Sequence, residues 1–477
     1  MLADAIASGI WAEAAKQSPI KSLCFFEKKS TINRQAGRSL TLPDQGKFAI
    51  MPRERLIALF PEASFGAALN CIGIAQALRE QGARPVFICH EHFQGLFAEY
   101  GFTEYPLLVD SPLSAEEHQH YWERFIKRNI PYFDQTPLDQ IDSYVAPAWE
   151  AIIDTVVEAE RPLQQLLSRL KPDAIVLDNV VMFPAIAKAG CPWVRVISCA
   201  ETELPDPAVP PYLSGASASD AMGCATYWQR YIKAVAPAHA RLSRFVESQG
   251  HSPCPPGIFL EESPWLNLLL SPTPVRYTRQ HPLDPTRFVY LEGCVRREAP
   301  YVVPPFPQCN DAPLIYISFG SLGAADVGMM KRLISVVASL PYRFLINVGA
   351  YRDQYESVPD NVYLDSWFPQ PATLRECQLF VHHGGNNSFC EALYFGLPSI
   401  IIPYCWDGHD NARRAEETGV GRYLPRFENP LSALPGAIEQ LLEDKAMHRR
   451  LQQSSSTMQS SHGTEVAARA ILRLPSL

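Results

Sequence analysis

The chain has 477 residues, enough for two domains that each bury a substantial core. It is 47% hydrophobic and 19% charged, and its formal net charge is -8, so it lacks the basic surface expected of a nucleic-acid-binding protein. No apolar run approaches the roughly 20 residues that span a bilayer, and no basic tract would hold the chain on anionic lipid. We therefore expect no integral membrane segment and at most a weak association with a membrane surface.

The first residues, MLADAIASGIWAEAAK, contain acidic side chains and no early basic ones, which is a poor signal peptide. The 12 cysteines are scattered without a C-x-x-C pair. A cytoplasmic location with reduced thiols is expected. Residues 1–50 are predicted to be an N-terminal extension, partly flexible. His118 and His120 are metal-ligand types, but their acidic and polar surroundings favour an exposed helix face.

An α/β rhythm begins after residue 51. A buried strand is predicted at 56–60, a loop at 61–68, a helix at 69–81 and the next strand at 86–89. Further strands are predicted at 174–177 and 193–198, with helices at 156–170 and 221–247. Residues 51–295 are therefore interpreted as one Rossmann-like domain.

Residues 296–313 are rich in proline and are the best interdomain linker by composition. After them, short apolar runs at 314–318, 344–348, 362–364, 379–381 and 399–402 alternate with helix-compatible segments. This pattern predicts a second Rossmann-like domain over 314–460. A C-terminal helix is expected within 461–477.

Two loops of the second half have the chemistry of a phosphate site. The strand at 379–381 leads into His383-Gly384-Gly385-Asn386-Asn387-Ser388, and a helix follows. The glycines let a ligand approach the backbone, and free amides at the helix start suit a diphosphate. The strand at 400–402 leads into residues 404–409. Both loops are expected at the carboxyl ends of strands, where ligands of open α/β sheets bind.

The stretch from Trp367 to Gly421 resembles the nucleotide-sugar-binding signature of inverting UDP-glycosyltransferases. This superfamily includes the bacterial macrolide and carotenoid-type small-molecule glycosyltransferases. The matching positions are Trp367, Pro369, Gln370, His383, Gly384, Gly385, Asn387, Ser388, Glu391, Gly396, Pro398, Pro403, Asp407, Asn411 and Ala412. The resemblance implies an α/β protein with the GT-B fold, in which two Rossmann-like domains face each other across a cleft. It also implies that the helix in 461–477 returns to the N-terminal domain.

The resemblance also implies roles in donor binding. Trp367 would stack on the uracil ring, Phe368 and Gln370 would fix the edge of the base, and Glu391 would accept hydrogen bonds from the ribose hydroxyls. The diphosphate would face His383, Gly384, Gly385, Asn387 and Ser388 on one side, and Ser318 and Ser321 on the other. Asp407 would hold hydroxyls of the sugar.

The chain departs from the family at the residue after Asp407. Gly408 stands where a Gln commonly helps to hold the sugar, so the donor sugar stays open. His409 or Asp410 could replace that Gln, although a solvated helix start is favoured for both. His382 is interpreted as the end of a strand. The chain has no Asp-x-Asp pair, so no metal is expected.

The usual catalytic base is also missing. The family has a His after a Gly in the loop that follows the first strand, and here Gly66 is followed by Ala67. Asp178 matches the Asp that orients this His, and it is one candidate base, acting directly or through water. Glu62, His90 or His92 are other candidates. A third alternative is that the base has been lost.

The predicted activity is that of a hexosyltransferase. It would move a sugar from a UDP- or dTDP-sugar to a hydroxyl of a small lipophilic acceptor, with inversion and with no cofactor besides the nucleotide sugar. The alternative is a catalytically weak or inactive auxiliary protein that binds nucleotide sugars. A GT-B enzyme of another type, such as a sugar-nucleotide epimerase, is disfavoured by the two ends of the signature, which begins at Trp367 and includes Asp407 and Asn411 near its end.

Overall fold

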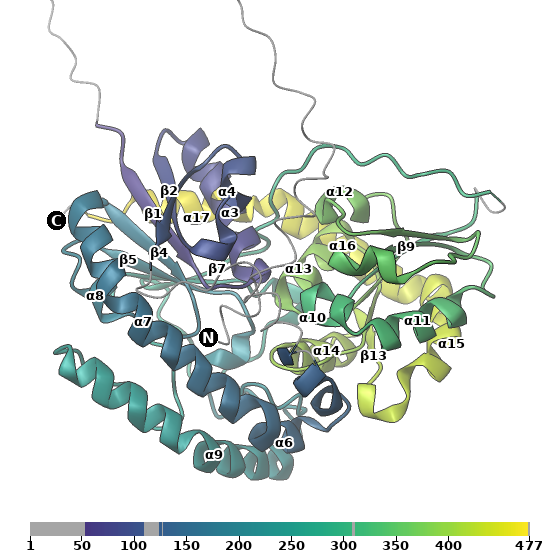
Figure 1. Ribbon diagram of the computed structural model, residues 1–477, viewed down its shortest axis with the longest axis horizontal. Helices are drawn as coiled ribbons and strands as arrows, with labels where there is room; N and C mark the ends of the chain where they lie inside the picture. Colours follow the sequence, from purple (N-terminus) through teal and green to yellow (C-terminus); the bar gives the residue numbers. More distant parts are fainter. Residues whose placement is uncertain (1–52, 109–123, 126, 308–310, 476–477) are drawn as a thin grey trace, which may run out of the picture.

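The structure is a computed structural model, and it describes residues 53–108, 124–125, 127–307 and 311–475. The predicted N-terminal extension, residues 1–50, and the His118–His120 segment lie outside these residues. Figure 1 shows two α/β halves side by side, the first in purple and blue and the second in green and yellow.

The first half contains a seven-stranded, fully parallel sheet in the order β3-β2-β1-β4-β5-β6-β7. Its central strands are continuous runs of buried residues, because helices cover both faces of a parallel sheet. The strands are β1 (Leu56–Pro61), β2 (Arg84–His90), β3 (Thr103–Leu107), β4 (Ala174–Asp178), β5 (Trp193–Ile197), β6 (Leu266–Leu269) and β7 (Phe288–Tyr290).

The first helix starts earlier than predicted. Helix α3 spans Phe65–Glu80, because the Ser64 side chain accepts a hydrogen bond from the Ala67 amide at 3.4 Å and caps the helix there. The predicted loop at 61–68 is therefore wrong beyond Ser64. The other helices of this half are α4 (Leu96–Glu99), α6 (Pro137–Gln140), α7 (Ala146–Leu170), α8 (Pro184–Ala187) and α9 (Ala221–Ser248). The long helices α7 and α9 lie side by side (Figure 1).

The second half contains a six-stranded parallel sheet in the order β10-β9-β8-β11-β12-β13. The strands are β8 (Leu314–Ser318), β9 (Arg343–Asn347), β10 (Val362–Asp365), β11 (Leu379–His382), β12 (Ser399–Ile401) and β13 (Gly421–Tyr423). The helices are α10 (Gly320–Ala325), α11 (Val327–Val337), α12 (Gln370–Leu374), α13 (Asn386–Phe395), α14 (Gly408–Glu417), α15 (Pro430–Glu443) and α16 (Lys445–Ser461). Two parallel sheets with covering helices confirm the predicted α/β class.

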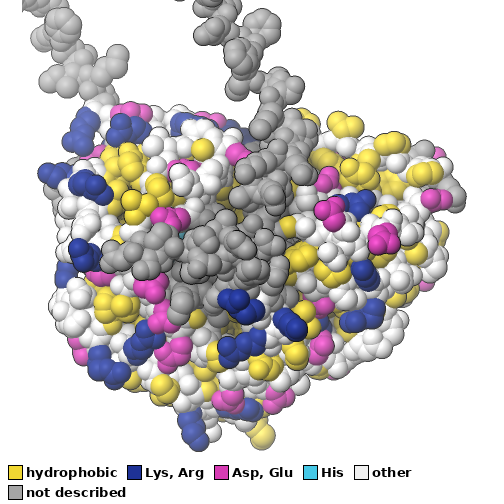
Figure 2. Space-filling view, viewed as in Figure 1, with side chains coloured by type: hydrophobic (Ala, Val, Ile, Leu, Met, Phe, Trp, Pro, Cys, Tyr) yellow, Lys and Arg dark blue, Asp and Glu magenta, His cyan; other side chains and the backbone are white. Residues whose placement is uncertain are grey.

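The last helix, α17 (Gly463–Leu472), leaves the second half and packs against α3. Its residues Ala467 and Ile471 are buried in the same apolar cluster as Ile72 of α3. This contact ties the two halves together, while the exact domain boundaries stay predictions. No helix in the described ranges is both long and apolar enough to cross a membrane. Figure 2 shows basic and acidic side chains interspersed over the visible face.

Candidate active site

A cleft of about 250 Å³ lies between the two halves. The loops after β8, β9 and β11 line one side of it, and Ser64, Phe65, Gly66 and Leu69 at the start of α3 line the other. In the second sheet the chain order reverses around β8, which is flanked by β9 and β11. Ligands of open α/β sheets bind at such a reversal, outside the carboxyl ends of the strands.

Aromatic side chains form one end of the cleft. Trp367, which follows β10, is half-buried and lines the cleft, with its ring centroid 6.3 Å from that of Phe65 across the interface. Phe368 also lines the cleft but is only 1% exposed, because its ring packs edge-to-face on Tyr316 at 5.4 Å in the core. The Trp367 side chain therefore offers the cleft a flat apolar surface of the kind that a planar base stacks on.

The carboxylate of Glu391 is buried near this end of the cleft, and both of its oxygens accept hydrogen bonds. Its Oε2 accepts a hydrogen bond from Gln370 Nε2 at 2.7 Å, and its Oε1 accepts one from Arg296 Nη1 at 2.8 Å. Gln370 also donates to Ser388 Oγ at 3.1 Å. Burial raises the pKa of Glu391, and the Arg296 guanidinium opposes that shift. Arg296 could not be recognised from the sequence as a site residue, because it lies in the predicted 296–313 linker, outside every motif.

The loop after β11 brings a histidine and a helix start to the cleft. Helix α13 has no side-chain cap, and Gly385, Asn387 and Ser388 at its start line the cleft. The ring of His383 is enclosed closely: a Cβ added to Gly385 would lie 2.6 Å from His383 Nε2, and one added to Gly320 would lie 3.0 Å from Cε1. Asp407 accepts a hydrogen bond from the Asn386 amide, and the next amides of the first turn, with the small residues around them, suit an anionic group.

The His383 imidazole is neutral near pH 7, because burial lowers its pKa to about 4. Its Nδ1 is buried and has no hydrogen-bond partner among the described residues. Ser318, at the end of β8, and Ser321, in α10, line the cleft beside His383, because β8 and β11 are neighbouring strands. His382 is fully buried at the end of β11, as expected for a strand end.

The structure explains why no side chain stands at position 408. A Cβ added to Gly408 would lie 2.5 Å from the carbonyl oxygen of His383, and one added to Gly384 would lie 2.6 Å from the carbonyl oxygen of Gly408. Gly384 also has a φ of +91°, a conformation that favours glycine. The two ligand loops therefore touch backbone to backbone, and a Gln at 408 would not fit this arrangement.

The residues around Gly408 are held by hydrogen bonds. Asp407 accepts from the Asn386 amide at 3.0 Å and from Asn411 Nδ2 at 3.1 Å, and burial raises its pKa to about 8. The expectation of a solvated helix start at His409 and Asp410 is wrong, since they are 1% and 3% exposed.

Both side chains bind the first half of the molecule instead. His409 Nε2 lies 3.0 Å from Gln140 Oε1, and burial lowers the pKa of His409 to about 4. Asp410 accepts hydrogen bonds from Thr202 Oγ1 at 2.6 Å and from the amides of Leu213 and Gly215 at 2.8 and 2.7 Å. These contacts join the donor-side loop to the opposite domain.

Two carboxyl groups meet at the end of the first sheet. Glu62 follows β1 and Asp178 ends β4, and the Glu62 amide donates to the Asp178 carbonyl at 2.6 Å. Burial raises the pKa of each carboxyl to about 7, and hydrogen bonds from Ser64 and Ser198 respectively oppose the shift. Asp178 is 2% exposed, whereas Glu62 is half-buried, so Glu62 is the more accessible of the two.

The other base candidates are less suited. His90 ends β2 and is 6% exposed, with its ring 5.7 Å from Phe60. The side chain of His92 is not described. Ala67 is buried in the first turn of α3 and carries no polar group.

A second cavity of about 470 Å³ lies in the first half, and we call it the aromatic groove. Its rings include those of Trp149, Tyr212, Trp228, Tyr231 and Phe259, with prolines of the 205–211 loop beside them. Trp149 stacks on Phe259 at 3.8 Å and lies 5.3 Å from Trp406, next to Asp407. The groove therefore abuts the loop at residues 404–409.

Glu203 also lines this groove and was missed from the sequence, since a Glu in a proline-rich loop carries no motif. It is 7% exposed. Burial raises the pKa of Glu203 well above its usual value, and the neighbouring charges of Asp407 and Asp178 add to the shift. The Glu203 side chain therefore lines the groove within electrostatic reach of Asp407 and Asp178.

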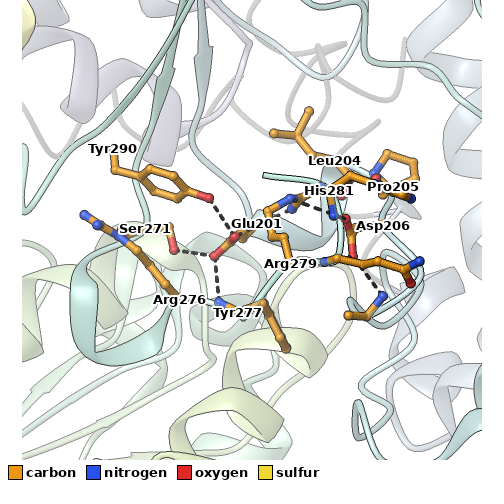
Figure 3. A network of polar contacts seen from close by, with 12 residues as sticks. Glu201, Leu204, Pro205, Asp206, Ser271, Arg276, Tyr277, Arg279, His281 and Tyr290 are labelled. Atoms are coloured by element: carbon orange, nitrogen blue, oxygen red, sulfur yellow. Dashed lines mark hydrogen bonds and ion pairs between the residues drawn. The ribbon is translucent and has the colours of Figure 1, made fainter. Parts of the chain in front are cut away.

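The loop that carries Glu203 is fixed by a polar network (Figure 3). Glu201 accepts hydrogen bonds from Ser271 Oγ at 2.9 Å and from the Tyr290 hydroxyl at 3.0 Å. Asp206 accepts from the amides of Gln280 and His281 at 2.9 and 2.8 Å. Figure 3 shows Arg279 between the two carboxylates. The groove is therefore a preformed feature of this domain.

Comparisons with known proteins agree with this geometry. Residues 331–472 match the family described as erythromycin biosynthesis protein CIII-like, C-terminal domain. The chain is 30% identical over 164 residues to the NDP-glycosyltransferase YjiC of Bacillus subtilis, a match that covers 34% of this chain and 42% of that protein. The first curated relatives are thus matched over less than half their own length. A demethyllactenocin mycarosyltransferase of Streptomyces fradiae is 22% identical and is covered over 89% of its length, with 91% of this chain.

Solved structures establish the architecture. The glycotransferase of kitacinnamycin superposes with a TM-score of 0.62 at 20% identity, covering 89% of this chain and 100% of that one. The glycosyltransferase VinC in complex with DTDP superposes with a TM-score of 0.59 at 17% identity, covering 88% and 98%. Together with the two parallel sheets, these matches show that the chain has the GT-B fold, and the family match over residues 331–472 supports the UDP-glycosyltransferase superfamily.

Proposed function

We propose that this protein is a glycosyltransferase that moves a sugar, a hexose in our proposal, from a UDP- or dTDP-sugar to a hydroxyl of a small lipophilic acceptor. The observation that carries the proposal is the adjacency of two features. The cleft lined by Trp367, His383 and the start of α13 is closed on its other side by Ser64, and the Ser64 hydroxyl donates to the Glu62 carboxylate at 3.4 Å.

In the proposed reaction the acceptor oxygen attacks the anomeric carbon, and the bond from that carbon to the diphosphate breaks. The electron pair leaves with the diphosphate, whose growing charge is stabilised by the amides at the start of α13 and by a neutral imidazole N–H of His383. The acceptor proton passes to a carboxylate. Attack from the face opposite the leaving group inverts the anomeric centre.

We assign the proton to Glu62 rather than to Asp178. Both have raised pKa values of about 7, which suits a base near neutral pH. Asp178 is the less accessible, and its Oδ1 already accepts a hydrogen bond from Ser198 Oγ at 2.6 Å. A charge on Glu62 would in turn raise the pKa of Asp178 further, which keeps Asp178 protonated beside it.

The aromatic groove is the proposed acceptor site. Its aromatic and proline lining favours apolar ligands. Its acidic lining residues are Glu203 and Asp206, and none of its lining residues is Lys or Arg. Uncharged phenols and alcohols are therefore favoured over carboxylic acids. The mycarosyltransferase of Streptomyces fradiae is consistent with a small-molecule acceptor, since its name gives demethyllactenocin as the molecule that it modifies.

A second candidate is an auxiliary protein that binds nucleotide sugars with little or no turnover. The observation that favours it is Ala67, which stands where the family has its catalytic His and which places no titratable group there. Under this alternative the donor cleft is retained, and the carboxyl pair is structural.

One experiment separates the two candidates. Purified protein is incubated with UDP- and dTDP-sugars and a panel of phenols, alcohols and carboxylic acids, and products are detected by mass spectrometry. Turnover that is lost in Glu62→Gln or Asp178→Asn, with nucleotide affinity unchanged by calorimetry, supports the enzyme. Nucleotide binding without any product supports the auxiliary protein. No binding of UDP or dTDP by folded protein would reject both.

A further inference from the structure

Arg296 joins the linker to the donor domain at a buried position. The linker is fixed on α3 by Gln76, whose side chain bonds the amide and carbonyl of Arg297 at 2.9 and 3.2 Å. From there Arg296 reaches across to Glu391 of α13 at 2.8 Å, and both side chains are 1% exposed. Desolvating a charge pair at this depth costs free energy. The buried pair therefore needs a compensating interaction or a functional role.

One nitrogen of the Arg296 guanidinium is left over. Nη1 donates to Glu391, and Nε donates to Glu298 Oε1 at 2.6 Å. Nη2 is buried and makes no hydrogen bond of good geometry within the described residues, although the Tyr100 hydroxyl lies close to the guanidinium. Arg296 also lines the cleft in which Trp367 and Gln370 lie. A buried donor without an acceptor is unfavourable unless a ligand supplies one.

The Glu391 carboxylate, in contrast, has few free hydrogen-bond acceptor positions. Its Oε1 accepts from Arg296 and also from Asn387 Nδ2 at 3.3 Å, and its Oε2 accepts from Gln370 at 2.7 Å. A carboxylate has about four lone-pair positions, so one remains. Glu391 alone is therefore poorly placed to bind the two hydroxyls of a ribose.

We propose that Arg296 is a donor-binding residue whose Nη2 donates to a ribose hydroxyl oxygen of the nucleotide, and that Glu391 acts mainly as the positioning residue that holds Arg296. This inference rests on the proposed function, which puts a nucleotide in the cleft. It adds to the site a residue that belongs to the linker. Donor affinity is thereby connected to the first domain, because Glu298 also accepts from the Tyr100 hydroxyl at 2.8 Å.

The test compares nucleotides that differ by one hydroxyl. Affinities of the full chain for UDP, 2′-deoxy-UDP and 3′-deoxy-UDP are measured by titration calorimetry. We expect wild-type protein to bind one of the deoxy analogues about tenfold or more weakly than UDP, as for a hydrogen bond to a charged donor. In Arg296→Lys, which keeps a cation beside Glu391 but removes Nη2, that ratio should fall to about two or less.

Arg297→Gln is the matched control. Arg297 is the neighbouring arginine of the same linker, and its side chain is 60% exposed in an ion pair with Glu80. This variant should keep the wild-type ratio. A double variant, Arg296→Met with Glu391→Met, removes both charges and should also lose the discrimination between UDP and the deoxy analogue. It provides the measurement if Arg296→Lys folds poorly.

The outcomes separate this inference from the proposed function. Equal affinities of wild-type protein for the three nucleotides, or an Arg296→Lys variant that weakens all three by the same factor, would overturn the role of Arg296 while leaving the donor cleft intact. Failure of wild-type protein to bind any of them would reject the proposed function and this inference with it.

Discussion

Glu62 is the proposed catalytic base, in place of the imidazole that is missing at position 67. Its carboxyl pKa is raised to about 7 by burial, so the basic form is populated only above neutral pH. Under the proposed reaction, kcat/KM should rise with pH through about 7 and then level off. Glu62→Gln should lower kcat by roughly 100-fold or more, the usual worth of a positioned base.

Asp178→Asn provides the comparison, because it alters the neighbouring carboxyl while leaving Glu62 in place. We expect a smaller loss of kcat. Initial rates measured from pH 5.5 to 9, with nucleotide affinity followed in parallel, decide between the two carboxyls. A Glu62→Gln enzyme that keeps its rate while Asp178→Asn loses it would reassign the base to Asp178.

Gly408 tests the contact between the two ligand loops. Its Cβ would lie 2.5 Å from the His383 carbonyl oxygen, so Gly408→Ala must push the loops apart. We expect it to lower the free energy of unfolding by roughly 1–3 kcal/mol and to weaken nucleotide binding, as measured by urea denaturation and calorimetry.

Gly436→Ala is the control for this variant. Gly436 lies inside α15, and a Cβ there would meet nothing within 4 Å. Alanine is the better helix former by roughly 0.5–1 kcal/mol, so this change should be neutral or stabilising. If Gly408→Ala and Gly436→Ala had the same free energy of unfolding and the same nucleotide affinity, the two loops would accommodate a side chain at position 408 without cost.

At the scale of elements, the first turn of α14 fastens the two domains through Asp410. Its carboxylate accepts one hydroxyl and two amide hydrogen bonds from the opposite domain. Asp410→Asn cannot accept all three and should lower the free energy of unfolding by about 2–3 kcal/mol. Asp142→Asn removes an exposed ion pair with Arg230 and should cost under about 1 kcal/mol. Urea unfolding of the two variants checks this. Similar decreases in the free energy of unfolding would contradict a role of Asp410 in holding the two domains together.

The elements that could be predicted are those whose signal is local. The strand at 314–318 matches β8 because a parallel strand buried on both faces is a plain apolar run. The start of α3 was missed because its cap at Ser64 lies within residues that read as a loop. The contacts of Asp410 and Arg296 could not be predicted for a different reason: their partners Gly215 and Glu391 are distant in sequence, so no local pattern indicates the contact.

At the scale of the whole molecule, buried carboxyls and buried histidines have opposite effects on how the free energy of unfolding depends on pH. Glu62, Asp178 and Asp407 have raised pKa values of about 7, 7 and 8, so the folded state keeps protons that the unfolded chain releases near pH 4. Their contribution falls as pH rises through those values. His383 and His409 have pKa values lowered to about 4, so their contribution rises with pH until about 6.5, where the unfolded imidazoles lose their protons.

The two effects partly cancel below pH 6.5, and only the carboxyl effect remains above it. We therefore expect the free energy of unfolding to decrease by on the order of 2 kcal/mol between pH 6.5 and 8, measured by urea denaturation at constant ionic strength. A double variant of Glu62→Gln and Asp178→Asn, which keeps the shape of both side chains without their titration, should show a shallower decrease. A wild-type stability that is constant or rising over this range would mean that the carboxyls at the domain interface are ionised without penalty.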